Sequence, residues 1–183
     1  MTRCHYLGEG RPGKLEGMNN FIESLQNFVL GLPEAIQFLG VALAAMVPFV
    51  ENYGAVVIGS VAGIPIWAVV IMAIVGNLAI IALLTLISGR TRDAVLARRG
   101  GAAPQSETLT GRQQRVRRLF DRYGIPGVTL IGMLLVPTHL IAVTLVGFGC
   151  SRSGVLVWQG IAITIYAVIS GALMLGLFSL SGL

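Results

Sequence analysis

Charged residues are scarce in this chain. They make up 11% of its 183 residues, against about 25% in ordinary soluble domains, while hydrophobic residues make up 55% and the mean hydropathy is +0.81. Apolar stretches of this extent are too long to be buried inside a small water-soluble fold. The composition therefore indicates an integral membrane protein, and we expect an all-α membrane fold.

Cysteine and histidine are equally rare, which excludes several kinds of site. Cys4 and Cys150 lie at opposite ends of the chain and give neither a disulfide framework nor a ligand spacing. Cys4, His5 and Glu9 are too few ligands for a metal ion, so we predict no metal site and no cofactor. The segment 1–18 has no apolar stretch, so it shows no secretory signal and is expected to be a disordered tail.

Segment 19–32 has the pattern of an amphipathic helix. Its polar residues lie on one face, and its apolar residues follow one helical stripe. The stripe consists of Phe21, Ile22, Leu25, Phe28, Val29 and Leu32. This pattern is typical of a helix that lies in the membrane interface.

The first repeat, 33–89, contains two short apolar segments and one long one. The segments 35–47 and 55–64 are each too short to cross a hydrocarbon core, and they are separated by a polar break that begins at Pro48. Two half-spans joined in this way predict a re-entrant helical hairpin. The apolar run at 66–88 is long enough for a transmembrane helix.

Glu51 is the most informative residue in this repeat. No other charged residue occurs between Gln37 and Gly89, and an ionised carboxylate in hydrocarbon is costly unless it has a partner or access to water. We therefore predict that Glu51 belongs to a functional site. Asn77, in the middle of the long run, is expected either to hydrogen-bond to another helix or to join that site.

A basic segment, 90–123, separates the two halves of the chain. It carries nine of the thirteen Lys and Arg residues, which places it in the cytoplasm by the positive-inside rule. We expect it to contact lipid head groups or a partner protein rather than nucleic acid, because no aromatic stacking platform accompanies the charges. The arginines expected on this surface are Arg112, Arg115, Arg117, Arg118 and Arg122.

The second repeat, 124–183, follows the same order as the first. A half-span at 124–136 leads to the break Pro137–His139, a second half-span at 140–148 and a charge-free crossing at 155–180. We predict another re-entrant hairpin and another transmembrane helix. Because the two hairpins then enter the membrane from opposite sides, the halves are expected to be inverted copies.

In transporters built from inverted repeats, the broken helices meet near the membrane midplane and form the binding site. Pro48 precedes Glu51 in the first break, and Pro137 precedes Thr138 and His139 in the second. We expect Glu51 and His139 to approach each other as a proton-titratable pair, because histidine changes charge near neutral pH. Proline kinks and an interhelical histidine hydrogen bond are the structural alternatives.

Several short motifs resemble those of the small multidrug export family of bacterial membrane proteins, which is thought to be distantly related to the DedA and VTT-domain proteins. The resemblance covers about residues 45 to 175, apart from much of the central segment. The motifs are Pro48–Glu51, Gly63–Pro65, Gly76–Asn77, Arg122–Gly124 and Val136–Thr138.

The resemblance implies two re-entrant helices that meet inside the membrane. DedA proteins are implicated in moving polyprenyl-phosphate carrier lipids or phospholipids with proton dependence. Their acidic residue in the first hairpin is matched by Glu51. Their arginines around the second proline are not matched, since Met133, Thr138 and His139 stand there.

The function that we expect is a small proton-linked secondary transporter that moves a lipid or amphipathic molecule across a bacterial inner membrane. The alternative is a membrane scaffold that recruits a partner through the arginine-rich segment. We do not expect an enzyme, because the sequence has no nucleophile constellation, metal cluster or nucleotide motif. Small residues at i, i+4 spacing, such as Gly59 and Gly63, suit close helix packing within one bundle or in a homodimer.

Overall fold

The computed structural model describes residues 13–98 and 110–181, and every regular element in these ranges is a helix. This confirms the all-α fold class. The elements are α1 (Gly13–Leu30), the 3-10 helix η1 (Glu34–Ile36), α2 (Gln37–Ala45), α3 (Glu51–Val61), α4 (Ile66–Arg98), α5 (Gly111–Gly132), α6 (Thr138–Gly147) and α7 (Arg152–Ser181).

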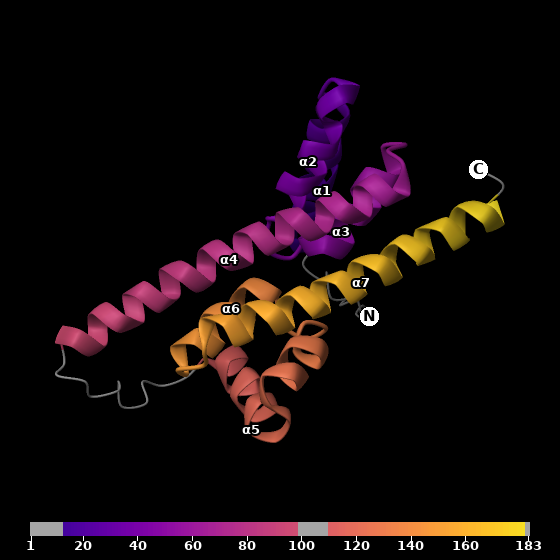
Figure 1. Cartoon of the computed structure of the whole chain (residues 1–183). Helices are drawn as coiled ribbons and strands as arrows, with labels where there is room; N and C mark the ends of the chain where they lie inside the picture. The colour runs from indigo at the N-terminus through magenta and orange to yellow at the C-terminus, as the bar shows by residue number, and fades with distance from the viewer. Residues whose placement is uncertain (1–12, 99–109, 182–183) are drawn as a thin grey trace, which may run out of the picture.

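The two long helices, α4 and α7, pack against each other over much of their length (Figure 1). They are antiparallel, because Asp93 near the end of α4 forms an ion pair with Arg152 at the start of α7. With 33 and 30 residues, they are about 50 and 45 Å long at 1.5 Å per residue. Both are long and apolar enough to cross a membrane. A third span is possible if α1 and α2, which are bent by 114° between Asn20–Leu30 and Glu34–Ala45, act as one.

The remaining helices form two groups on this pair. Figure 1 shows α1, α2 and α3 beside the first part of α4, and α5 and α6 beside the first part of α7. Each group has its own buried apolar cluster. One contains Val41, Val56 and Val69, and the other contains Ile81, Val116, Ile141, Leu145 and Ile163. The contact between the two groups is where the candidate site lies.

Both groups contain two consecutive helices separated at a proline. α2 ends at Ala45 and α3 begins after Pro48; α5 ends at Gly132 and α6 begins after Pro137. Proline supplies no backbone N–H and disfavours helical conformation in the residue before it, so a continuous helix through either break is disfavoured. α2 and α5 themselves end three and five residues before the proline. Within each pair the two helices pack against one another.

Helices extend further than the apolar runs predict. α1 begins at Gly13, so the last part of the expected tail is helical, while residues 1–12 lie outside the described ranges. α4 continues through the basic residues to Arg98. α5 begins at Gly111 with a capping box between Thr110 and Gln113, and it is kinked at Gly124 (φ +64°), where the apolar half-span 124–136 is expected to begin. Arginine and alanine favour helix as well as leucine does, so a change of polarity need not end a helix.

Glycines allow the helices to approach closely at two places. A Cβ on Gly76 would lie 2.0 Å from the Ala42 carbonyl oxygen, which shows that α4 touches the backbone of α2 there. A Cβ on Gly59 would lie within 2.9 Å of Val41 and Val69. Gly59 of the predicted small-residue pattern therefore serves packing within this chain.

Candidate functional site

Glu51 is fully buried at the first residue of α3, with an exposed fraction of 0%. Its backbone has φ +52°, and that of Phe49, two residues earlier, has φ +75°. In residues other than glycine, this left-handed backbone conformation costs about 1–2 kcal/mol. Strained backbone of this kind persists where the surrounding structure holds it, often at functional sites. Here it turns the chain around Pro48 and directs the carboxylate toward α6.

The Glu51 carboxylate is bound by the first residue of α6. Its Oε1 accepts a hydrogen bond from the Thr138 backbone N–H at 2.5 Å and another from the Thr138 hydroxyl at 2.9 Å. Pro137, the N-cap residue, makes no side-chain capping bond. Glu51 therefore takes the place of an N-cap for a helix 87 residues away in sequence, where the helix dipole favours a negative charge.

His139 lies beside the same carboxylate oxygen. Its Nδ1 is 3.6 Å from Glu51 Oε1 and 3.4 Å from the Thr138 hydroxyl oxygen. Its Nε2 is 3.0 Å from the Met46 carbonyl oxygen. A carbonyl oxygen can only accept, so Nε2 carries a proton and donates it to Met46. The position left for a second proton is Nδ1, which faces Glu51.

Two buried amides complete the cluster from α3 and α7. The Asn52 amide donates to the Ile163 carbonyl oxygen at 2.8 Å, and the Gln159 amide donates to the Thr138 carbonyl oxygen at 3.3 Å. Within the described ranges, Glu51 Oε2, Asn52 Oδ1 and Gln159 Oε1 are buried without a hydrogen-bond partner. These three unpaired oxygens can all act only as acceptors while Glu51 is ionised. A proton on Glu51 Oε2 would turn that oxygen into a hydrogen-bond donor.

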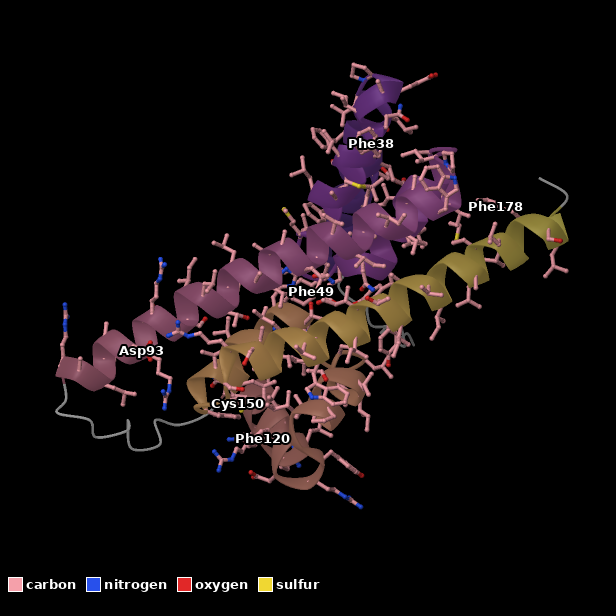
Figure 2. The ribbon with its side chains drawn as sticks, in the orientation of Figure 1. Phe38, Phe49, Asp93, Phe120, Cys150 and Phe178 are labelled. Carbon is pink, nitrogen blue, oxygen red and sulfur yellow. The ribbon has the colours of Figure 1, made fainter. Side chains whose placement is uncertain are left out.

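A groove of about 440 Å³ opens beside this cluster, a size within the range of small-molecule sites. It is lined by Met46, Pro48, Phe49, Ile80, Leu84, Arg112, Pro137, His139, Leu140 and Val143. The Arg112 guanidinium lies 5.9 Å from the centre of the Phe49 ring, a cation–π distance. Figure 2 shows Phe49 in the middle of the molecule, between the two helix groups.

The structure thus brings together most of the residues that the sequence singled out. Glu51, Thr138 and His139 are in contact, and both prolines line the adjoining groove. Asn77 is separate: it is fully buried in α4, but its side chain has no hydrogen bond within the described ranges. The interhelical bond expected of it is not formed there.

The five arginines of α5 do not form one site. Only Arg112 reaches the groove. Arg117 pairs with Asp121 at 3.1 Å on the exposed face. Arg115, Arg118 and Arg122 line a separate shallow depression with Tyr123.

Sequence reasoning overlooked Asn52, Gln159 and the groove position of Arg112. Asn52 adjoins Glu51 in the polar break, and Gln159 is a polar residue in an otherwise apolar crossing, so both carried a signal. Arg112 carried none, because its place beside Phe49 depends on how α5 packs.

Comparison with known proteins adds no further constraint: the chain matches no family model, and no curated protein or solved structure is significantly similar to it. The resemblance to the small multidrug export family therefore stays a prediction.

Proposed function

We propose that this protein is a small secondary transporter of a bacterial inner membrane, which links proton movement at Glu51 and His139 to the passage of a lipid or amphipathic molecule. The observation that carries the proposal is the fully buried Glu51 carboxylate, bound across the two helix groups beside His139, which lines a groove. Buried ionisable groups in membrane proteins mark ion and substrate pathways.

The hydrogen bonds of the cluster accommodate two protonation states. In one state Glu51 is ionised and a proton on His139 Nδ1 faces it across 3.6 Å. In the other state the proton lies on Glu51 Oε2, which makes no hydrogen bond of normal geometry within the described ranges, although the Tyr53 phenol interacts with this carboxylate. Because the groups are in contact, a proton on one of them changes the charge that the other faces. A proton can therefore enter or leave the pair while the fold retains its other bonds.

The cluster also joins parts of the chain that would move in alternating access. Glu51 and Asn52 belong to the first helix group, whereas Thr138, His139 and Gln159 belong to α6 and α7. A displacement of one group against the other changes the Glu51–Thr138 bonds. Protonating Glu51 weakens them, since charge-assisted hydrogen bonds are about twice as strong as neutral ones. This is the coupling that a proton-linked carrier needs, with the two proline breaks as inverted re-entrant hairpins.

The test is reconstitution into vesicles with a pH gradient and an internal pH dye. A panel of single-chain amphiphiles with anionic, zwitterionic and cationic head groups supplies candidate substrates. We expect substrate-dependent proton flux that Glu51→Gln abolishes. Glu34→Gln, which changes an exposed carboxylate in η1, should leave the flux unchanged. Normal flux in folded Glu51→Gln protein would refute the mechanism.

The depression on α5 favours a second candidate, a scaffold that binds a partner. Arg115, Arg118 and Arg122 surround about 400 Å³ together with Tyr123, and arginine and tyrosine are enriched in interfaces. A scaffold predicts a stable complex that is lost when the three arginines become glutamine. Glu51→Gln should leave that complex unchanged, which separates this function from transport.

A further inference from the structure

The groove beside His139 adjoins a second apolar pocket. Pro48 and Phe49 line both of them. The second pocket encloses about 520 Å³ between α1 and α3, and its other lining residues are Gly17, Phe21, Ile22, Gln26, Val50, Gly54, Val57 and Ile58. Phe49, which is 63% exposed, lines both the groove and the pocket. Taken together, the two have a charged end at α5 and an apolar end at α1.

Arg112 supplies the fixed charge at the first end. Within the described ranges it has no carboxylate partner, and its guanidinium rests over the Phe49 ring. Glu51 does not line the groove, and its carboxylate is fully buried. A ligand in the groove therefore contacts the Arg112 guanidinium and not the Glu51 carboxylate.

His139 lines the groove without offering it a free ring nitrogen. Nε2 is engaged by the Met46 carbonyl oxygen, and Nδ1 faces Glu51 and Thr138. One permanent positive charge thus remains for the ligand. It matches a single negative charge, whereas a doubly charged phosphate needs more cationic partners. A guanidinium binds a carboxylate through two parallel hydrogen bonds, and a singly charged phosphodiester competes for the same geometry.

We propose that the groove and the adjoining pocket together bind a long-chain carboxylate. Arg112 binds the head group, and the acyl chain passes over Phe49 into the pocket between α1 and α3. The inference rests on the proposed function in taking this cavity as the substrate path, but the binding itself requires no transport. It names the charge and shape of the substrate that the transporter would carry.

The probe is palmitate with a photoreactive diazirine at its terminal carbon, added to the full chain in phosphatidylcholine nanodiscs. After irradiation, intact mass gives the labelling yield and peptide mass spectrometry gives the labelled residues. We expect labelling at residues 17–26 and 48–58. Arg112→Gln should lower the yield about tenfold, which corresponds to the loss of a charge-assisted hydrogen bond. Arg118→Gln, on the same helix but outside the cavity, should leave the yield unchanged.

Competition identifies the head group, and a steric variant tests the tail. Unlabelled palmitate should displace the probe, whereas hexadecyltrimethylammonium and lysophosphatidylglycerol should displace it poorly. Val57→Trp, which fills the apolar pocket, should abolish labelling there. Equal or better displacement by either competitor overturns the proposal, as does labelling that is spread over the lipid-facing side of α7 or is insensitive to Arg112→Gln.

Glu51→Gln separates this inference from the proposed function. If palmitate labels the cavity in that variant and in the wild type, but neither protein carries protons, the binding site stands and the transporter does not. If proton flux depends on Glu51 while palmitate fails to label the cavity, the transporter stands and the carboxylate ligand is wrong.

Discussion

Glu51 and Thr138 are held together by two hydrogen bonds to a single carboxylate oxygen, one from the backbone N–H and one from the hydroxyl. The pair joins the start of α3 to the start of α6, so it fixes the two proline breaks relative to each other. Hydrogen bonds to a charged acceptor inside an apolar helix bundle are stronger than the same bonds in water.

Thr138→Val removes the hydroxyl bond and keeps the backbone bond and the side-chain shape. Hydrogen bonds to charged groups contribute about 1.5–3 kcal/mol, so we expect the free energy of unfolding to fall by roughly 2 kcal/mol. Denaturant unfolding in mixed micelles measures it. Thr138→Ser, which keeps the hydroxyl, should stay close to wild type, and equal losses in both variants would contradict the assignment.

His139→Gln removes the ring nitrogen that faces Glu51 and leaves an uncharged polar side chain in its place. Histidine is the side chain that titrates between about pH 5 and 8. We therefore expect a folded protein whose substrate-dependent flux no longer varies over that range. The measurement is the pH profile of flux in vesicles, and an unchanged profile would exclude His139 from the proton pathway.

Asn77 and Asn52 provide a matched pair for testing buried polar groups. Both are fully buried, but only Asn52 has a hydrogen bond within the described ranges, to the Ile163 carbonyl oxygen. Asn77→Leu should be neutral or stabilising, because it removes unpaired polar atoms, whereas Asn52→Leu should cost about 1–3 kcal/mol by leaving that carbonyl unpaired. Thermal unfolding in detergent compares them. Equal destabilisation would show that Asn77 has a partner after all.

Gly76→Ala should weaken the packing of α2 on α4. Its Cβ would meet the backbone carbonyl of Ala42 at 2.0 Å, so the helices must separate. Overpacking of this kind costs about 1–3 kcal/mol. The control is Gly147→Ala at the end of α6, where a Cβ meets nothing within 4 Å, and the unfolding temperature should not fall there. A stable Gly76→Ala protein would mean that α2 and α4 are further apart.

The ion pair between Asp93 and Arg152 should contribute little to stability despite joining the two long helices. The Asp93 and Arg152 side chains are 62% and 38% exposed, and exposed pairs contribute about 0.2–1 kcal/mol. A double-mutant cycle with Asp93→Ala and Arg152→Ala should give a coupling in that range, which falls as salt is added. A coupling energy well above that range would indicate that the ion pair is buried and important for holding α4 and α7 together.

The fold was predictable where a pattern is local. The apolar runs at 66–88 and 155–180 predicted the two long helices, and the prolines at 48 and 137 predicted the breaks. The helix ends were less accurate, because α4 extends to Arg98. Hydropathy reports where lipid could surround a helix, whereas helix propensity and capping decide where the helix stops.

The candidate site was predictable only in part. A buried charge stands out in an apolar sequence, so Glu51 could be found from its surroundings along the chain, and a titratable residue after the second proline marked His139. Gln159 was overlooked because one amide in a long apolar helix has several ordinary explanations. No local pattern marks Arg112 as a residue of the groove.

The sequence alone determined that the chain is helical, that two of its helices are apolar and long, and that one carboxylate must lie among them. These features follow from composition and periodicity, which act over a few turns of helix. Only the tertiary structure decided that the Thr138 backbone N–H binds Glu51, that His139 Nε2 donates to Met46, and that Arg112 covers Phe49. Such contacts depend on how short helices from distant parts of the chain pack against α4 and α7, and that arrangement is set by the whole core rather than by any one segment.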